Sequence, residues 1–419
     1  MEKARIISSK KSTRKSDVLA NLWVCILFLA LGIPSEVCAQ LTDLPGDFLA
    51  ADFHQDRRQK LREKLPANSV AVFFANPVRN RANDVDYVYH QDPDFYYLTG
   101  YREPNAVLLI FSENQTAANG TQYNEIIFVQ PRNPDREKWD GRRLGADQVR
   151  TRLGIEQAFN NTEFKKYDLD FSRFNEVLFF DFQNDVRDDP ADSADLYDMI
   201  EMFKVKAGYP RRDGMTLRTV EGRKNNLNTQ RLEDIMGELR EIKTPEELGL
   251  IRKAVAVSSI SQVEVMKAIK PGMSEREVQG IHEYVFKKYQ AEDVGYPSIV
   301  GGGHNGCILH YIDNYKPALD NKELILMDLG AEYHGYTADI TRTIPVNGKF
   351  SPEQRQIYQI VLDAQEAGMK ICKEGATFDQ LNKVTRETVN RGLAKLGILS
   401  NDELDDRQYY PHGCCHYIG

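Results

Sequence analysis

Two aspartates in one hairpin-like stretch are the residues whose types and spacing most directly suggest chemistry. Asp328 and Asp339 lie within Glu323–Val346, where two apolar runs flank His334 and Gly335. A two-residue turn at that pair places position 328 opposite 341 and position 330 opposite 339. The two aspartates then share one face of the hairpin and lie diagonally across from each other, with Cα atoms about 7–8 Å apart.

Carboxylates at these positions need an explanation, because aspartate is disfavoured in strands and two buried carboxylates repel each other. The apolar run Leu324–Met327 precedes Asp328 and predicts a buried position for it. A divalent cation bound by both carboxylates is the interpretation we favour, and a pair that shares one proton is a second. The alternative is a solvent-facing polar edge at which both aspartates are simply hydrated.

Histidines near these strands are weaker candidates. His310 follows an apolar run downstream of the glycine-rich segment Gly301–Gly303, and a single histidine in such a place is more often structural. His304 and His334 are expected to be loop residues.

The sequence ends in PHGCCHYIG, in which His412 and His416 bracket Cys414 and Cys415. Thiolates and imidazoles together are ligands of soft metals such as zinc, so a separate soft-metal site is one hypothesis for this segment. The i, i+4 spacing of the histidines suits one face of a helix. The proline and glycine on either side of His412 instead favour an extended segment.

Composition limits the remaining possibilities. The length of 419 residues suggests two to three domains, and 41% hydrophobic residues are typical of a protein with substantial cores. The net charge of −8 does not indicate a nucleic-acid or anionic-membrane surface. Four cysteines lie beyond residue 39, which is too few for a disulfide framework.

Residues 1–39 have the layout of a secretory signal peptide. A basic stretch is followed by the apolar run Val18–Ile33 and by small residues before Gln40. This pattern predicts a secreted or periplasmic protein. An uncleaved leader that anchors the protein in a membrane is the alternative.

The region 45–228 is predicted to be an α/β domain. Its strand-like runs are Ser69–Ala75, Ala106–Phe111, Glu125–Val129 and Glu176–Phe182, and its helical candidates are Phe53–Leu65 and Ala191–Lys204. The polar segment Tyr209–Asn228 is interpreted as a linker. Thr244 and Pro245 then mark the start of a helix, and a second domain is expected to span 242–419.

One segment of the second domain recurs. Ala268–Ile281 and Ile371–Val384 align at an offset of 103, each with the end of a helix, a glycine and a Ser or Thr that opens the next helix. An internal duplication with a site between its halves is the interpretation we favour. A chance match between two common helix-turn patterns is the alternative.

Several stretches together resemble a known family. YPSIVGGGHNGCILHY, LMDLGAEYHGYTADITRTIPVNGKFSPEQRQIY and HGCCHYIG resemble the aminopeptidase P and prolidase family of proline-specific metallopeptidases. Upstream, DFYYLTGYREPNAVLLIF and WDGRRLG resemble the amino-terminal domain of aminopeptidase P, and the likeness runs from about residue 48 to the last residue. The resemblance implies an α/β (α+β) protein, with an N-terminal α/β domain followed by a catalytic domain of the pita-bread fold.

The resemblance also implies roles for individual residues. Asp328, Asp339 and His416 would be ligands of a two-metal centre. His310 and His412 would orient the substrate, stabilise the tetrahedral intermediate and transfer protons. In this interpretation the two terminal cysteines are bystanders.

The implied reaction is hydrolysis of the bond between an N-terminal residue and a following proline by a metal-bridging water. The two divalent ions would be Mn²⁺ in most members and Co²⁺ or Zn²⁺ in some, and Cys415 next to a ligand raises the case for zinc. The partners would be peptides with proline at the second position, without nucleic acid. Tyr96 stands where the family often has a tryptophan that contacts substrate from a neighbouring subunit, so a homo-oligomer is compatible with the sequence.

The sequence departs from the family at its end. The family's two glutamate ligands and a further histidine lie downstream of the position of His416, and the sequence ends at Gly419. We therefore expect this to be a fragment of a longer protein, truncated within the catalytic domain and inactive as it stands. Two other functions remain open, an Xaa-Pro dipeptidase and a non-catalytic pita-bread protein that binds peptides.

Overall fold

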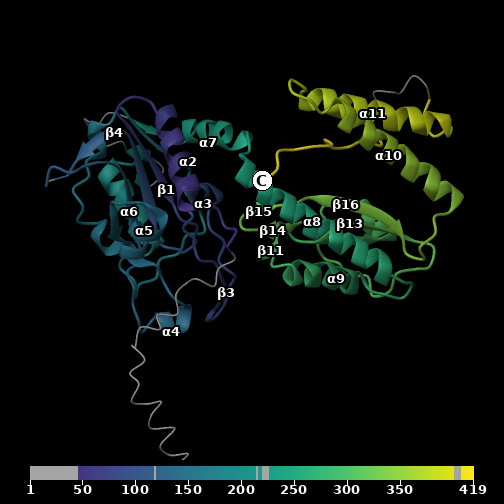
Figure 1. Cartoon of the computed structure of the whole chain (residues 1–419), viewed down its shortest axis with the longest axis horizontal. Helices are drawn as coiled ribbons and strands as arrows, with labels where there is room; N and C mark the ends of the chain where they lie inside the picture. Colours follow the sequence, from purple (N-terminus) through teal and green to yellow (C-terminus); the bar gives the residue numbers. More distant parts are fainter. Residues whose placement is uncertain (1–45, 118, 214–215, 219–225, 401–406) are drawn as a thin grey trace, which may run out of the picture. The chain divides into compact units, whose positions relative to one another are not determined.

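The computed structural model describes residues 46–117, 119–213, 216–218, 226–400 and 407–419. The predicted signal peptide, residues 1–39, lies outside the described residues. Residues Leu49–Gly419 form one compact unit. It contains two separate sets of sheets and helices, which are coloured from purple to teal and from green to yellow in Figure 1.

The first set is built on a six-stranded mixed sheet with the strand order β10-β7-β1-β4-β5-β6. Its strands are β1 (Ser69–Phe74), β4 (Val107–Thr116), β5 (Gln122–Val129), β6 (Ala158–Asn160), β7 (Glu176–Phe179) and β10 (Leu227–Asn228). β4 is antiparallel to β1 and β5, and the other neighbouring pairs are parallel. The four predicted strands are confirmed, each with slightly different ends.

The predicted linker is partly wrong. β10 lies in the segment Tyr209–Asn228 and pairs with β7, with Leu227 opposite Val177. Apolar burial also continues past this segment, because helix α7 (Arg231–Glu241) buries Leu232 and Met236 in the same core as the sheet. The polar composition of this segment therefore gave no sign of the short edge strand β10.

Both faces of this sheet are covered, which explains its continuous apolar runs. In β1, Ala71 and Phe73 belong to one core, and Val70 and Val72 belong to another. Helices α2 (Ala51–Lys64), α5 (Gly145–Leu153) and α7 pack on the first core, and α6 (Leu196–Ala207) packs on the second. The remaining elements are α3 (Pro93–Thr99), α4 (Glu137–Asp140), the short helices η2 (Asn161–Glu163) and η3 (Phe171–Arg173), and the strand pairs β2 (Asn80–Ala82) with β3 (Val85–Asp86) and β8 (Arg211–Asp213) with β9 (Thr216–Arg218).

The second set contains two three-stranded antiparallel sheets, with the orders β11-β14-β15 and β12-β13-β16. The strands are β11 (Asp293–Val294), β12 (Ile299–Gly302), β13 (Leu324–Leu329), β14 (Ala331–Tyr333), β15 (Tyr336–Thr337) and β16 (Ile340–Pro345). Helices α8 (Pro245–Ala268), α9 (Glu275–Lys288), α10 (Pro352–Ile371) and α11 (Phe378–Lys395), and the short helix η4 (Gly303–Cys307), complete it. The predicted helix start is confirmed, because the Thr244 side chain accepts a hydrogen bond from the Glu247 amide and Glu247 reciprocates.

The register predicted for the aspartate hairpin is confirmed. Tyr333 faces Tyr336, and Asp328 faces Thr341. His334 and Gly335 both have positive φ, at 52° and 83°, which is the backbone of the type I′ turn that joins twisted strands.

The two copies of the repeat have the same local structure. Gly272 and Gly375 have φ of 89° and 84°, and each is followed by a helix with a reciprocal capping box. Ser274 pairs with Glu277 in the first copy, and Thr377 pairs with Gln380 in the second. The two copies therefore share the whole capping box, which includes the N-cap residue and the side chain three positions later that bonds back to it.

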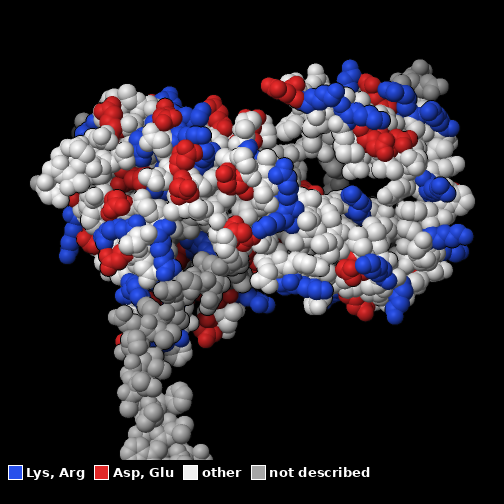
Figure 2. Space-filling view, viewed as in Figure 1, with Lys and Arg blue, Asp and Glu red and all other residues white. Residues whose placement is uncertain are grey.

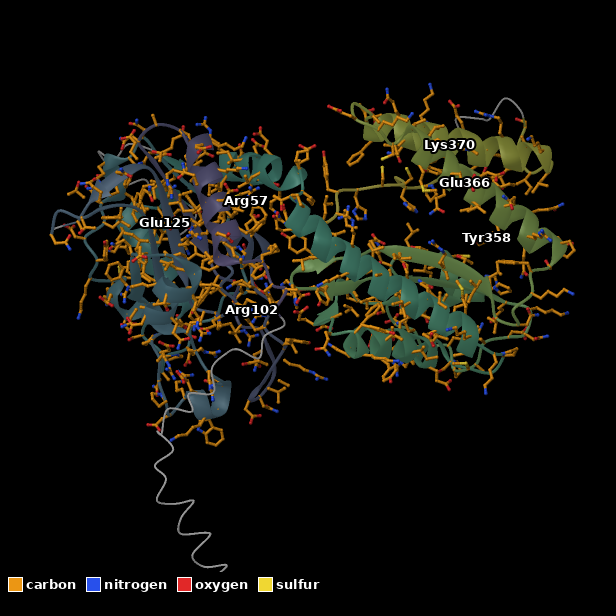
Figure 3. All side chains as sticks on the ribbon, in the orientation of Figure 1. Arg57, Arg102, Glu125, Tyr358, Glu366 and Lys370 are labelled. Atoms are coloured by element: carbon orange, nitrogen blue, oxygen red, sulfur yellow. The ribbon has the colours of Figure 1, made fainter. Side chains whose placement is uncertain are left out.

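Helices α10 and α11 pack closely through small residues. α10 buries Ala364 and Gly368, and a side chain at Gly368 would meet the Thr385 methyl group at 3.0 Å. Figure 3 labels Tyr358, Glu366 and Lys370 along the same helix. Among the helices that the structure describes, none is long and apolar enough to span a bilayer.

Surface charge is mixed on the face seen in Figure 2, where lysine and arginine residues are interspersed with aspartate and glutamate. This distribution accords with the acidic overall balance of −8. A single-sign surface of the kind that nucleic acids select is not the pattern on this face.

Candidate metal centre

The two aspartates of the hairpin converge on one hydroxyl group. The Tyr296 phenol lies 2.6 Å from Asp328 Oδ1 and 3.0 Å from Asp339 Oδ1. Asp328 is on β13, Asp339 is in the break just before β16, and Tyr296 is in the segment between β11 and β12. Burial and then the hydrogen bond to Asp328 raise the pKa of Tyr296, so its hydroxyl keeps its proton and acts as the donor.

The predicted burial of Asp328 is only half right. Along β13, Ile325, Met327 and Leu329 are buried, whereas Asp328 lies on the alternate face, which is half-buried. The sequence does not reveal this alternation, because Leu324 and Leu326, on the same face as Asp328, are apolar although they are partly exposed. Asp328 and Asp339 therefore open toward solvent on one face while the other face packs in the core.

His416 joins the same group of side chains. Its Nε2 lies 2.8 Å from Asp339 Oδ2, and its Nδ1 lies 2.6 Å from the Tyr417 carbonyl oxygen. A carbonyl can only accept, so Nδ1 carries a proton. In the neutral imidazole, Nε2 then carries a lone pair that faces a lone pair of the Asp339 carboxylate oxygen. The two lone pairs repel at this distance unless a proton or a metal cation lies between them.

The contact between His416 and Asp339 can be satisfied in two ways. Protonation of His416 is the first way, because the Tyr417 carbonyl and then the Asp339 carboxylate raise the pKa of the imidazole. A divalent cation is the other solution, since two carboxylates and an imidazole nitrogen are ligands that hard and borderline divalent ions accept. A hydrogen bond from Nδ1 to a backbone carbonyl is also the usual way in which a metal-binding histidine is oriented. Asp328, Asp339 and His416 therefore have the donor chemistry that the sequence implied, but their ligand atoms do not all lie within 4.8 Å of one another in this structure.

The hairpin is supported from behind by helix α8. At the break between β13 and β14, the Ala331 amide donates to Ser258 Oγ, at 2.9 Å. Gln262 donates to the Ile340 carbonyl at 3.2 Å. A side chain at Gly330 would overlap the Ala338 carbonyl oxygen, at 1.5 Å, so the backbones cross at a point where only glycine fits. These contacts fix the strand ends that carry the two aspartates.

The other predicted site residues lie as follows. His310 is exposed in the turn after η4, and His412 is exposed with its Nδ1 2.7 Å from the Gly413 carbonyl. The segment from Pro411 onward is not helical and has bends at His412 and Cys414, so the i, i+4 spacing of the histidines does not place them on one helix face. Hydrogen bonds link four side chains, those of Asp328, Asp339, His416 and Tyr296. Within the described residues, no hydrogen bond places His310 or His412 among them.

Tyr96, the predicted substrate-binding residue, packs within its own chain. It lies on α3, and a side chain at Gly335 would meet its ring at 2.7 Å. Its ring also forms an edge contact with His54. Burial raises the pKa of Tyr96. The tyrosine thus covers the tip of the aspartate hairpin, and its contact with substrate stays a prediction.

The terminal cysteines do not form a metal cluster in the described part of the chain. Burial raises the pKa of the Cys415 thiol to about 11, so it is protonated near neutral pH. A protonated thiol is a poor ligand, because the thiolate is the form that binds metals.

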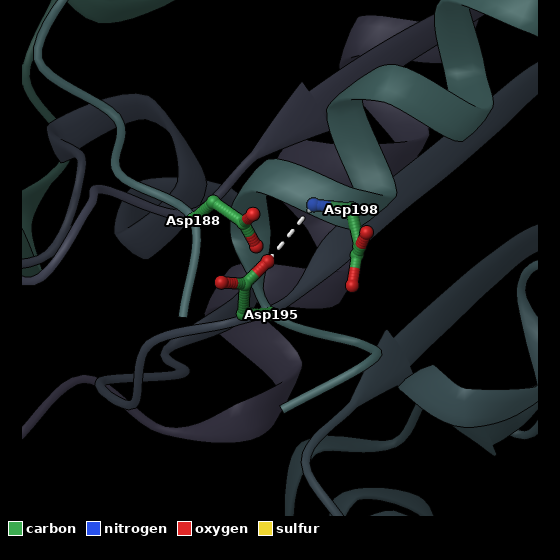
Figure 4. A group of neighbouring side chains, drawn as sticks. All are labelled: Asp188, Asp195 and Asp198. Atoms are coloured by element: carbon green, nitrogen blue, oxygen red, sulfur yellow. Dashed lines mark hydrogen bonds between the residues drawn. The ribbon is translucent and has the colours of Figure 1, made fainter. Parts of the chain in front are cut away.

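Among the described residues, the acids whose carboxylate oxygens lie close enough together to hold a metal ion are Asp188, Asp195 and Asp198 (Figure 4). Asp195 caps helix α6 by accepting a hydrogen bond from the Asp198 amide at 2.8 Å, and its second oxygen accepts from the Asp189 amide at 2.7 Å. The buried carboxylate is therefore satisfied by backbone groups, and the cluster has a structural explanation.

Comparison with known proteins identifies the family of the chain. Residues 249–419 match metallopeptidase family M24, and residues 54–175 match the aminopeptidase P N-terminal domain. The Xaa-Pro aminopeptidase of Escherichia coli is 33% identical over 380 residues, which cover 87% of this chain and 79% of that protein. The chain belongs to metallopeptidase family M24 and to its Xaa-Pro aminopeptidases.

Further relatives have the same description. Human Xaa-Pro aminopeptidase 3 is 28% identical over 357 residues, covering 84% of this chain and 65% of that protein. Two solved structures superpose with a TM-score of 0.74, the aminopeptidase PepP of Pseudomonas aeruginosa and aminopeptidase P from E. coli with the inhibitor Pro-Leu. Their sequences are 31% and 30% identical to this one, respectively. Each superposition covers 89% of this chain, together with 80% of the P. aeruginosa protein and 82% of the E. coli protein. These relatives confirm the predicted architecture, an aminopeptidase P N-terminal domain followed by a pita-bread catalytic domain, and the enzyme class, a metal-dependent hydrolase.

Tyr296 is the member of this hydrogen-bonded group that the sequence did not predict. It lies inside one of the stretches that carry the family resemblance, but nothing in its neighbours marks it. Pairing of β12 with β13, which places Ile299 opposite Asp328, brings its segment to the aspartates.

Proposed function

We propose that the protein removes the N-terminal residue from peptides whose second residue is proline. The observation that carries this proposal is that Asp328 and Asp339 meet at the Tyr296 hydroxyl while His416 contacts the second oxygen of Asp339. The family membership supplies the reaction class. The bond before proline is a tertiary amide without an N–H group, so its cleavage calls for a dedicated site.

In this proposal Asp328, Asp339 and His416 hold two divalent ions, Mn²⁺ in the first place, with Co²⁺ or Zn²⁺ as alternatives. When bound, the ions would polarise the scissile carbonyl and lower the pKa of the attacking water that bridges them. Tyr296 orients Asp328 by donating to its Oδ1, and the Tyr417 carbonyl orients the His416 ring. His310 and His412 are assigned to substrate orientation and proton transfer.

The relatives support the substrate class. The proteins of highest similarity reported above are named Xaa-Pro aminopeptidases. One solved relative is described with the inhibitor Pro-Leu, the dipeptide that would remain after cleavage of an Xaa-Pro-Leu tripeptide. We extend this preference for proline at the second position to the present chain.

Cellular location and assembly belong to the same proposal. We propose a secreted or periplasmic protein on the pattern of residues 1–39, and an assembly of identical subunits in which Tyr96 contacts substrate. The proposed domain ranges are 45–228 and 242–419, and the family matches at 54–175 and 249–419 fall within them.

The experiment is a comparison of two substrates with the natural protein that contains this sequence. After metal removal and addition of Mn²⁺, an Xaa-Pro-Xaa tripeptide and an Xaa-Pro dipeptide are followed by release of the first amino acid. Release from the tripeptide is expected, in a metal-dependent manner. Cleavage of the dipeptide alone would favour a dipeptidase, and binding of both without cleavage would favour a peptide-binding protein.

A further inference from the structure

Glu275 is a fully buried carboxylate at the start of α9 that the roles above do not use. Its side chain is 0% exposed. Oε1 accepts hydrogen bonds from the Gly302 amide at 2.7 Å and from Asn305 Nδ2 at 3.0 Å. Oε2 accepts from the Tyr311 hydroxyl and from the Lys316 amide, both at 2.8 Å. Four donors therefore satisfy one ionised carboxylate, which is the arrangement that makes a buried charge stable.

Three of these four partners lie in a single loop, residues 303–316, which carries His310. Gly302 immediately precedes the loop and Lys316 ends it. Asn305 and Tyr311 lie on the two sides of His310, and Tyr311 also accepts a hydrogen bond from the Tyr315 amide at 2.9 Å. One carboxylate thus fixes both ends of the loop and the residues that flank the histidine.

The tip of the loop has little apolar burial of its own. Ile308, Leu309 and Ile312 are each more than half exposed. The other anchor is Asn314, which is buried and donates to Gln279 of the same helix at 2.8 Å. Because hydrophobic burial contributes little at the tip, the conformation around His310 depends on polar contacts. Asn314 also bonds to the Ser298 carbonyl and to the Val300 amide of β12, whereas most of the contacts that come from α9 end on Glu275.

We propose that Glu275 is a positioning residue of the peptidase, which holds loop 303–316 so that His310 is presented to the substrate in a fixed place. The inference rests on the proposed function, since Glu275 acts through His310. The negative charge matters as well as the shape, because all four partners are donors. A glutamine at this position would turn an N–H₂ group toward two of them and leave donors unpaired.

The test is a double-mutant cycle in the natural protein, with kcat/KM measured on an Xaa-Pro tripeptide. Glu275→Gln is compared with Glu277→Gln, which removes a charge from the same helix turn at an exposed position whose contact is the cap of α9. We expect Glu275→Gln to lower kcat/KM by about 10- to 100-fold, the effect of a misplaced group, and Glu277→Gln to lower it less than about twofold. In a His310→Ala background, Glu275→Gln should cause less than about twofold further loss.

A wild-type rate for Glu275→Gln, or an undiminished effect of it in the His310→Ala background, would overturn the proposal. If Glu275→Gln does not fold, Tyr311→Phe replaces it, because that change removes one of the four donors and keeps the ring. Amide hydrogen exchange is measured in parallel, because it reports on the anchoring of loop 303–316 by Glu275 independently of the proposed peptidase activity. Faster exchange in 303–316 for Glu275→Gln than for Glu277→Gln is expected even if the protein fails to cleave Xaa-Pro peptides. Unchanged exchange would refute the anchoring itself.

Discussion

Tyr296 donates a 2.6 Å hydrogen bond to Asp328, although Tyr296 lies between β11 and β12, Asp328 lies on β13, and the whole loop that carries His310 separates them in sequence. The same hydroxyl lies 3.0 Å from Asp339. One phenol has a single proton, so it cannot satisfy two ionised carboxylates fully. The remaining negative charge at this point is what a cation would neutralise.

Tyr296→Phe should weaken the metal centre while keeping its ligands. The change removes the hydrogen bond that orients Asp328, and loss of such an outer contact costs about 10- to 100-fold in metal affinity or activity. Mn²⁺ titration followed by calorimetry measures the affinity. Tyr284→Phe is the control, since Tyr284 is an exposed tyrosine of α9. Equal Mn²⁺ affinity in both variants would exclude a role for the Tyr296 hydroxyl.

His54 should make folding stability depend on pH. Burial lowers the pKa of His54 to about 4 from its ordinary value of 6.5, with its Nδ1 2.9 Å from the Tyr97 carbonyl. In the unfolded chain His54 is therefore protonated below pH 6.5, whereas in the folded protein it is protonated only below about pH 4. The contribution of His54 is present above pH 6.5 and is lost progressively as the pH falls toward 4, by about 3 kcal/mol in total.

Urea unfolding of His54→Gln at pH 7, 6 and 5 checks this expectation. The variant should be less stable at pH 7 and should lose less stability than the wild type as the pH falls. His282 remains in both proteins and has the same sign, because burial lowers its pKa to about 3. Parallel pH profiles for the two proteins would show that His54 does not contribute.

Gly330→Ala should disrupt the hairpin at the crossing of its strands. The added methyl group would overlap the Ala338 carbonyl oxygen, which is backbone and cannot move without shifting the segment that carries Asp339. Such overpacking costs about 1–3 kcal/mol, and Mn²⁺ affinity should fall together with the free energy of unfolding. Gly237→Ala in α7 is the control, since open space surrounds that position and alanine stabilises an exposed helix by up to about 1 kcal/mol. A Gly330→Ala protein as stable as the wild type would mean that the strands do not cross this closely.

Local signals explain what could be predicted from the sequence. The hairpin register follows from a two-residue turn, and His334 and Gly335 adopt the positive φ angles that this turn needs. The start of α8 follows from Thr244, whose cap depends on residues within three positions. Elements whose cause lies within a few residues are therefore predicted well.

Long-range packing explains what could not. Leu324–Met327 reads as buried on both faces, but the neighbours of β13 cover only the face of Ile325 and Met327. β10 looks like linker because its two residues gain their strand character from pairing with β7. Tyr296 reaches the aspartates only through the pairing of β12 with β13, and its own sequence neighbours do not announce that contact.

Asp328 is the most direct test of the metal centre. The natural protein and its Asp328→Asn variant are stripped of metal, and release of the first residue from an Xaa-Pro-Xaa tripeptide is measured with and without added Mn²⁺. A metal ion held by Asp328 predicts metal-dependent release by the wild type and at least about a hundredfold slower release by the variant, whose circular dichroism and unfolding midpoint stay close to those of the wild type. Wild-type release by Asp328→Asn, or release by the wild type without any metal, would contradict it.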